Sequence, residues 1–384
     1  MKKILALVLC LLMVAGAFAC AAPAAAPAPA AAPAAEAAPA AEAAPAAEAA
    51  PAEEAKTMKI FALTPTEDHG WTGSIATFAK QACDELNAAG KYEAELLTAG
   101  GPAEQIQLIE DLLANNKPDE FGVAMLPYDD TVEAAVTQLM DAGVPVIMVD
   151  RIITSQASRA VANVKGDNEG TGAAAGWYLT EKGMQPGDKV YIIEGDSSSV
   201  NVARNDGFTK YLLGELEYAG SKIATPWTQE QIDSGRILSG VTGWSQATAQ
   251  NMFETLMSDA SNADVKYIAS WDSGTAMGVL DALSGSAIDE GIKTKFLANK
   301  PYVCGCSGHP GLYALLEGTS TDEAYKAIYD QLGGMMYTTY EPEMMKQGVL
   351  LLADYLDGKT VEQDFVIPTE VVTSENCANF TPFF

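Results

Sequence analysis

The strongest constraint on the fold is an uninterrupted apolar run over residues 144–149 that leads directly into the charged pair Asp150-Arg151. A run of strand length without polar alternation has no solvent-facing side, so it predicts a central strand of a parallel sheet, covered on both faces. The two charges then lie at the carboxyl end of the strand, where open α/β sheets bind ligands. A carboxylate beside a guanidinium suits neighbouring hydroxyl groups, because it offers acceptors and donors together. The alternative is a strand-end ion pair that faces solvent.

Strand and helix patterns alternate along the chain on both sides of this run. Strands are predicted over 58–63, 92–98 and 121–126, each followed by a helical pattern, and a second series begins with a strand over 189–194. This alternation predicts βαβ units with right-handed crossovers. A late helix over 343–356 is expected to return to the first series. The sequence therefore predicts an α/β fold of two doubly wound parallel-sheet lobes, joined by a multi-strand hinge that favours closure over a ligand.

The same patterns give the expected boundaries of the lobes. The N-terminal lobe is expected over 57–165 plus about 341–366, and the C-terminal lobe over 166–340 plus about 367–384. The C-terminal lobe is expected to include a strand over 222–225.

The N-terminus has the pattern of a secretion signal. Met1-Lys2-Lys3 precedes an apolar run that ends at Ala19, so residues 1–19 are expected to be a signal peptide. Cys20 follows a small residue, as in a bacterial lipobox, and its thiol is expected to be lipidated. Cleavage by ordinary signal peptidase at the same place is the alternative, because Ala17-Phe18-Ala19 also matches its small-residue pattern.

Residues 20–56 are almost wholly Ala, Pro and Glu. Such a segment has little to bury, and its regularly spaced prolines prevent a continuous helix. It is expected to be a solvated tether that reaches on the order of 100 Å, at about 3.1 Å per residue.

Charge and cysteine content narrow the classes of partner. The formal net charge of −28 argues against nucleic acid and anionic lipid surfaces. The sequence contains no second hydrophobic span, so attachment to the membrane by the lipid anchor alone is expected. The protein is also expected to be a monomer. Two His in the chain, neither at ligand spacing from Cys304-Gly305-Cys306, argue against a metal site, and no cofactor is expected. The remaining thiols allow three pairings, with buried thiols or a disulfide to Cys377 expected; they are Cys83, Cys304, Cys306 and Cys377.

Several polar and aromatic residues follow predicted strands and are candidates for ligand contact. His69 and Trp71 lie in an expected loop after the first strand, and Trp71 is suited either to core packing or to stacking on a flat apolar face. Arg204 near a helix N-terminus is slightly unfavourable, which indicates a role in the cleft. Trp244 and the pair Trp271-Asp272 follow the same logic. No nucleophile–base spacing, phosphate-binding loop or positioned carboxylate pair is present, so no enzymatic activity is expected.

The order of four segments resembles the periplasmic sugar-binding proteins of ABC importers, of the ribose- and galactose-binding type. These segments are 144–151, 167–172, 204–208 and 271–278, within a resemblance that covers about residues 58–360. It implies a type I two-lobe fold whose cleft closes on one sugar. It also implies a non-catalytic lipoprotein receptor outside the cytoplasm, anchored to the outer face of the cell membrane or periplasmic in a Gram-negative cell, which delivers a monosaccharide to an ABC permease. The alternative is a receptor of the same fold for a sugar-like signal, an autoinducer or a nucleoside.

The resemblance also implies roles for individual residues. Asp150, Arg151 and Arg204 would bind sugar hydroxyls, and Trp71 and Trp244 would stack on its faces. Three positions depart from the family: Trp271 stands in place of Asn, Ser307 in place of a carboxylate, and Tyr340 in place of Gln. These changes predict a ligand that is larger or less densely hydroxylated than ribose. The expected ligand set is therefore His69, Trp71, Asp150, Arg151, Arg204, Trp244, Trp271, Asp272, Ser307 and Tyr340.

Overall fold

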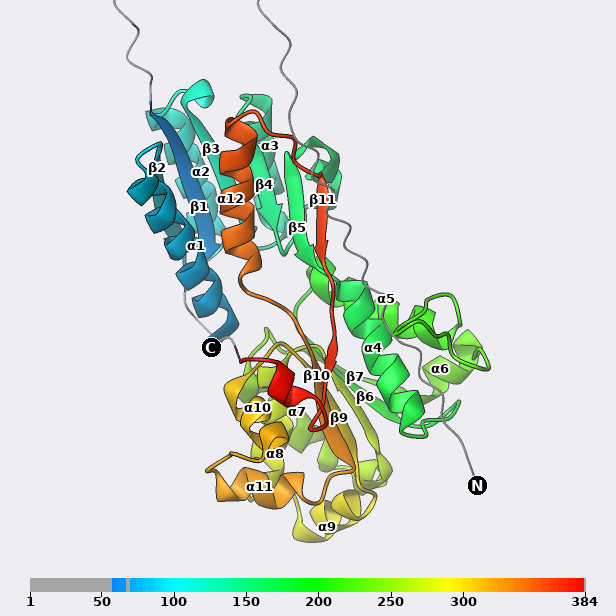
Figure 1. Ribbon diagram of the computed structural model, residues 1–384. Helices are drawn as coiled ribbons and strands as arrows, with labels where there is room; N and C mark the ends of the chain where they lie inside the picture. The colour runs from blue at the N-terminus through cyan, green and yellow to red at the C-terminus, as the bar shows by residue number, and fades with distance from the viewer. Residues whose placement is uncertain (1–56, 67–69, 383–384) are drawn as a thin grey trace, which may run out of the picture. The chain divides into compact units, whose positions relative to one another are not determined.

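The computed structural model describes residues 57–66 and 70–382 (Figure 1). The expected signal peptide, Cys20, the tether and His69 lie outside the described residues. No helix in the described part of the chain is long and apolar enough to cross a bilayer.

The first sheet has six strands, all of them parallel. In spatial order they are β11 (Asp364–Ile367), β5 (Ala162–Gly166), β4 (Val146–Val149), β3 (Phe121–Met125), β1 (Met58–Pro65) and β2 (Tyr92–Ala99). The predicted central strand is confirmed, because β4 lies between β5 and β3 and all its residues are buried. Figure 1 shows β11 (red) beside β5 (green), although the two are far apart in the sequence.

Helices cover both faces of this sheet because its strands alternate apolar side chains toward both faces. Ile60 and Ala62 of β1 pack in one core with α1 (Gly70–Ala89) and α12 (Met344–Leu356). Phe61 and Leu63 of the same strand pack in a second core. That core also takes apolar residues of α2 (Pro102–Asn115) and α3 (Glu133–Asp141). The expected return of a late helix to the first sheet is confirmed, since α12 packs on β3, β4 and β5.

The second sheet also has six strands, parallel except for β12, which runs antiparallel to β10. In spatial order they are β12 (Val371–Val372), β10 (Gly334–Thr338), β9 (Tyr302–Cys306), β8 (Tyr267–Ser270), β6 (Val190–Glu194) and β7 (Arg236–Val241). We refer to each sheet with its helices as the first and the second lobe.

Two layers of helices enclose the second sheet. One core contains residues of α4 (Asn168–Glu181) and α5 (Ser199–Leu212). The opposite core contains residues of α7 (Gln246–Met257), α8 (Ser273–Ser284), α9 (Glu290–Ala298), α10 (Pro310–Glu317) and α11 (Glu323–Tyr329). A short helix, α6 (Gln229–Gly235), precedes β7. Short 3-10 turns lie at Pro118–Glu120, Asp130–Val132, Thr154–Arg159, Ala260–Asp264 and Cys377–Asn379.

Two glycines allow α4 and α5 to cross with their backbones in contact. A Cβ atom at Gly172 would lie 2.0 Å from the carbonyl oxygen of Arg204, and one at Gly207 would lie 1.9 Å from that of Glu169. No side chain fits at either crossing point. The close approach therefore fixes where Arg204 lies relative to α4.

The prediction of a strand over 222–225 is wrong. Its backbone is irregular and makes no ladder, and the sixth strand of this sheet is instead β7. The β-branched residues of 222–225 resemble a strand, but the adjoining Pro226 lacks an N–H donor and packs at Gly214, which follows α5. β7 is an edge strand whose residues are partly buried or exposed, so it lacks the buried apolar run that identified the central strands.

The chain passes between the two sheets three times, after β5, after β10 and after β11. Two of these crossing segments are bonded to each other at Thr339 and Glu370. The Thr339 N–H donates to the carbonyl oxygen of Glu370 at 2.9 Å, and the Glu370 N–H donates to Oγ1 of Thr339 at 2.9 Å. Thr369 Oγ1 donates to the carbonyl oxygen of Thr339 at 2.8 Å. The expected multi-strand hinge is therefore present, and its strands are coupled.

Glu341, in the segment after β10, carries a partly buried carboxyl group. Its Oε2 is buried and has no hydrogen-bond partner in the described structure. Burial, together with the charges of Glu343 and Glu370, raises the pKa of Glu341 to about 7 from its usual 4.5. The folded chain therefore holds a proton here between these two pH values that the unfolded chain releases.

The hinge should consequently lose stability as the pH rises from about 4.5 to about 7. Above that range the folded state has to bury a charged carboxylate. We expect Glu341→Gln to melt at a higher temperature than the wild type at pH 8, and to show a smaller fall in melting temperature between pH 5 and pH 8. Glu362→Gln, at an exposed position, is the control. Equal pH slopes for Glu341→Gln and the wild type would contradict this assignment.

Candidate functional site

A cavity of about 40 Å³ lies where the carboxyl ends of the two sheets face the hinge. Eight of the ten residues expected from the sequence line it, and Val200 and Cys306 complete its wall. Of the other two expected residues, Trp271 lies in the core and His69 is outside the described residues. The lining residues are Trp71, Asp150, Arg151, Val200, Arg204, Trp244, Asp272, Cys306, Ser307 and Tyr340.

Three of the lining residues have left-handed backbone conformations, which are uncommon for residues other than glycine. Asp150 has a φ of 62°, Trp244 of 62° and Ser307 of 74°. Each follows a strand of its sheet. Such conformations cost of order 1–3 kcal/mol each and are concentrated at functional sites. Their convergence on one cavity indicates that the surrounding structure is built to hold these three side chains.

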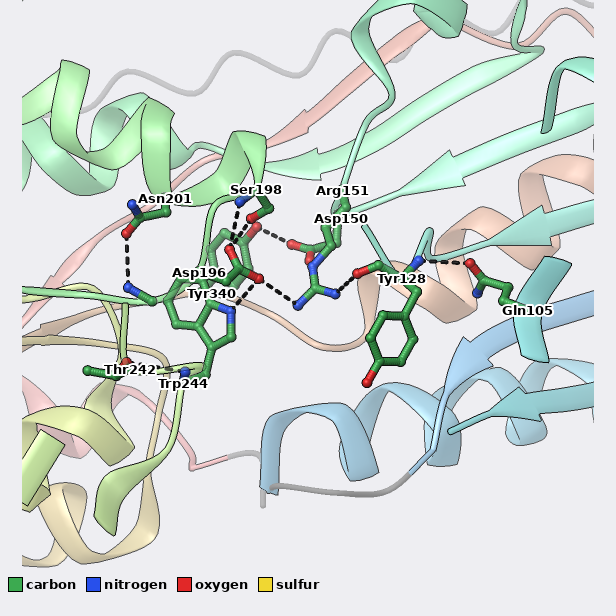
Figure 2. Close-up of polar contacts among 11 residues, drawn as sticks. Gln105, Tyr128, Asp150, Arg151, Asp196, Ser198, Asn201, Thr242, Trp244 and Tyr340 are labelled. Carbon is green, nitrogen blue, oxygen red and sulfur yellow. Dashed lines mark hydrogen bonds and ion pairs between the residues drawn. The ribbon is translucent and has the colours of Figure 1, made fainter. Parts of the chain in front are cut away.

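Asp150 is the buried anion of the cavity, with 5% of the residue exposed. Its Oδ1 accepts a hydrogen bond from the hydroxyl of Tyr340, as Figure 2 shows. Burial raises the pKa of Asp150, and Arg151, Tyr340 and Arg204 offset part of that rise. Burial and the Asp150 charge hold the pKa of Tyr340 well above its usual value, so its hydroxyl keeps its proton. Asn168 Nδ2 donates to the same hydroxyl at 3.1 Å.

Arg204 is the buried cation of the cavity, with 3% of the residue exposed. Its Nε donates to Asn168 Oδ1 at 2.9 Å, and its Nη1 donates to the carbonyl oxygen of Trp271. Its guanidinium carbon lies 4.4 Å from the centroid of the Tyr340 ring and 5.6 Å from that of the Trp244 ring. These contacts fix the guanidinium plane by hydrogen bonds and cation–π attraction.

Trp271 supports Arg204 from the core and does not line the cavity, unlike the expectation from sequence. The residue is 1% exposed, and its indole lies edge-on to the Phe208 ring at 6.1 Å. Its Nε1 donates to Asn205 Oδ1 at 2.8 Å. A strand-end position identified this residue, but the direction of its side chain depends on the packing of α5.

Trp71 lines the cavity from a helix and not from the expected loop, because α1 begins at Gly70. Its Nε1 donates to the carbonyl oxygen of Tyr340 at 3.3 Å. The two rings lie 5.6 Å apart with an interplanar angle of 37°. The first lobe thus presents an aromatic ring to the cavity, and the hinge holds that ring in place.

Arg151 and Ser307 each have a buried polar atom without a hydrogen-bond partner among the described residues, Nε of Arg151 and Oγ of Ser307. Both residues line the cavity. A buried unpaired polar atom costs about 1–3 kcal/mol. A hydroxyl-bearing ligand is suited to this cavity, because it supplies an acceptor to the first atom and either role to the second.

Asp272 and Cys306 line the cavity, and the other described cysteines lie in the hydrophobic cores. Asp272 Oδ1 caps α8 by accepting from the Thr275 N–H at 3.0 Å. The four described cysteines are buried free thiols, so the expected disulfide with Cys377 is not formed and the alternative of buried thiols holds. Within the described ranges, no group of three or more His, Cys, Asp or Glu side chains is arranged to hold a metal ion.

Asp196 is a site residue that sequence reasoning missed. Its carboxylate lies 3.4 Å from Nη2 of Arg151 and accepts from Nε1 of Trp244 at 2.8 Å (Figure 2). Asp196 is separated from the end of β6 only by Gly195. Polar residues directly after strands are candidates for ligand contact, and Asp150 was found in this way, so the same criterion would have found Asp196. A run of serines after it resembled an ordinary solvated loop.

The Tyr340–Asp150 bond yields a test of the cavity that requires no ligand. Tyr340→Phe removes the hydroxyl donor from a buried carboxylate, and we expect it to lower the free energy of unfolding by about 1–3 kcal/mol in urea. Tyr355→Phe, on the exposed side of α12, is the matched control and should change little. If both variants unfold at the wild-type urea concentration, the bond does not stabilise the cavity.

Comparison with known proteins assigns this chain to a family. Residues 60–360 match the family model described as a periplasmic binding protein domain. No curated protein matches.

Solved structures with the same fold are distant in sequence. The Caulobacter myo-inositol binding protein bound to myo-inositol is 16% identical, with a TM-score of 0.63 over 85% of this chain and 96% of that chain. An ABC transporter solute binding protein from Agrobacterium vitis with bound D-fucose is 18% identical, with a TM-score of 0.59 over 83% and 96%. One from Bacillus halodurans with bound myo-inositol is 17% identical, with a TM-score of 0.61 over 85% and 98%. The chain therefore belongs to the periplasmic binding protein family, with the type I fold.

Proposed function

We propose that this protein is a non-catalytic receptor that captures a neutral sugar in the cleft between its lobes and delivers it to the permease of an ABC transporter. The observation that carries the proposal is the central cavity, where buried charges and aromatic rings converge at the carboxyl ends of both sheets. The ligand-bound solute receptors of the same fold support the choice of a sugar or polyol.

The chemistry of the cavity suits a compact polyol. Asp150 supplies an acceptor, and Arg151 and Ser307 supply polar atoms without partners. Trp71 and Trp244 supply apolar faces that can cover the C–H groups of a sugar ring. Wider openings of about 470 Å³ and 240 Å³ share Trp244 with the cavity and give room for a ligand that extends past it.

The charges around the cavity favour a neutral ligand over an anion. The carboxylates of Asp150, Asp196 and Asp272 face the guanidinium groups of Arg151 and Arg204, which leaves a small excess of negative charge. A sugar acid or sugar phosphate would add a negative charge beside these carboxylates, which repel it.

The family supports a location outside the cytoplasm, and the sequence of the first 20 residues supports a lipid anchor. A periplasmic binding domain acts outside the cytoplasm, and we propose that a lipid on Cys20 holds this monomeric receptor at the membrane. Radiolabelled palmitate incorporated into the full chain, and not into Cys20→Ser, would support the anchor. Labelling of both proteins, or of neither, would contradict it.

Binding can be tested by thermal shift against D-ribose, D-galactose, L-arabinose, myo-inositol and D-galacturonate, followed by calorimetry with any sugar that raises the melting temperature. We expect a neutral sugar to bind and galacturonate not to bind. Binding of galacturonate alone, or of no compound in the panel, would argue against the proposed ligand class.

Asp150→Asn should weaken the binding of the same sugar by more than about 2 kcal/mol, because it removes the charge and replaces one acceptor oxygen with an N–H donor, which leaves a hydroxyl donor without its acceptor. Asn tolerates the left-handed backbone at this position, so the fold should persist. Asp111→Asn, on the exposed side of α2, should bind like the wild type. An unchanged dissociation constant for Asp150→Asn would remove Asp150 from the site.

A further inference from the structure

A chain of polar contacts runs between the lobes through Asp196, as Figure 2 shows. One carboxylate oxygen of Asp196 lies 3.4 Å from Arg151 Nη2 of the first lobe and accepts from Trp244 Nε1 of the second lobe at 2.8 Å. The other oxygen accepts from the N–H of Ser198 at 2.9 Å and from its hydroxyl. Both oxygens of the Asp196 carboxylate therefore have partners.

The first-lobe end of this chain is rigid. Nη1 of Arg151 donates to the carbonyl oxygen of Tyr128. The Tyr128 N–H donates to Gln105 Oε1 at 2.8 Å, and Gln105 Nε2 donates to the carbonyl oxygen of Leu126 at 3.0 Å. Gln105 is completely buried, so the guanidinium of Arg151 is anchored through Tyr128 to the interior of the first lobe.

The second-lobe end is equally constrained. A Cβ atom at Gly195 would lie 2.1 Å from the indole of Trp244, so the loop that carries Asp196 packs directly on that ring. The Gly243 N–H donates to the carbonyl oxygen of Gly195 at 2.8 Å, and the Gly195 N–H donates to Asn201 Oδ1 at 2.9 Å. This packing and a hydrogen bond from the Trp244 N–H to Thr242 Oγ1, at 3.2 Å, hold the left-handed backbone of Trp244 in place.

Asp196 carries a charge within this network. Burial alone would raise its pKa, but Arg151 and the hydrogen bonds from Ser198 and Trp244 hold the pKa of Asp196 below its usual value. The side chains of Arg151 and Asp196 are 15% and 23% exposed, respectively. A partly buried ion pair within a hydrogen-bonded network is screened less than an exposed pair.

We propose that Asp196 is a positioning residue of the binding site that joins the two lobes and holds Arg151 and Trp244 as one unit. This inference rests on the proposed function of the cavity. Because Tyr128 and Asp196 hold Nη1 and Nη2 of Arg151, its unpaired Nε remains for the ligand. The same carboxylate sets the orientation of the indole face. Asp196 thus couples lobe closure to the geometry of the site, although it is absent from the cavity wall.

The coupling can be measured without any sugar by fluorine NMR of the full chain labelled with 5-fluorotryptophan. The chain has five tryptophans, and Trp244→Phe assigns the resonance of Trp244. We expect Arg151→Met, in the first lobe, to shift the Trp244 resonance, and Asp196→Ser to shift it as well. The double variant should shift it no further than Asp196→Ser alone. Arg159→Met, which removes another first-lobe arginine that pairs with Asp141, is the matched control.

A Trp244 resonance that stays in place in Arg151→Met but moves in Asp196→Ser would overturn the proposal, because Asp196 would then act only within its own lobe. No shift in Asp196→Ser would overturn it as well. Should Arg151→Met fail to give a folded spectrum, Arg151→Gln replaces it with the same expectation. None of these outcomes depends on whether the sugars of the panel bind, so failure of the proposal is distinguishable from failure of the proposed function.

A second readout applies with the panel sugar that gives the largest thermal shift. We expect Asp196→Asn to lower its affinity about tenfold, mainly through faster dissociation, because the neutral amide loses the ionic attraction to the guanidinium of Arg151. Asp233→Asn, the same change at an exposed position of α6, should bind as the wild type does. Equal dissociation rates for Asp196→Asn and the wild type would count against the positioning role.

Discussion

The burial of the Asp150 carboxylate is the constraint on which the rest of the site depends. A charge removed from water is costly unless hydrogen bonds and opposite charges compensate for the loss of hydration. Here the compensation comes from three parts of the fold: Arg151 beside it, Tyr340 from the hinge, and Arg204 from the second lobe. A single anion at a strand end therefore requires both lobes and a crossing segment to be in place.

Arg204 shows how packing far from the cavity meets this requirement. Its guanidinium can reach the cavity because α4 and α5 cross through Gly172 and Gly207, where no side chain fits. Rings of Trp244 and Tyr340 then flank it, and the carbonyl oxygen of Trp271 accepts from it. The aromatic side chains of the site thus orient a cation as well as offering faces to a sugar.

The residues of the site that directly follow buried strands were predictable, because their positions depend on local sequence. The apolar run before Asp150 placed that residue at the end of a buried strand, and the same rule applied to Ser307 after β9. Trp271 met the rule equally well, but its indole packs in the core against Phe208. The sequence pattern shows which residue lies at the end of a strand. The direction of its side chain depends on how the neighbouring helices pack.

By itself, the sequence determined the two-lobe α/β architecture and the buried strand that ends at Asp150, because apolar periodicity reports burial residue by residue. Only the tertiary structure decided that Tyr340 and Asp150 share a hydrogen bond, that the cysteines are free thiols, and that Asp196 joins the lobes. These contacts link segments far apart in the chain. Their energies depend on distance and burial in three dimensions, which no local pattern records.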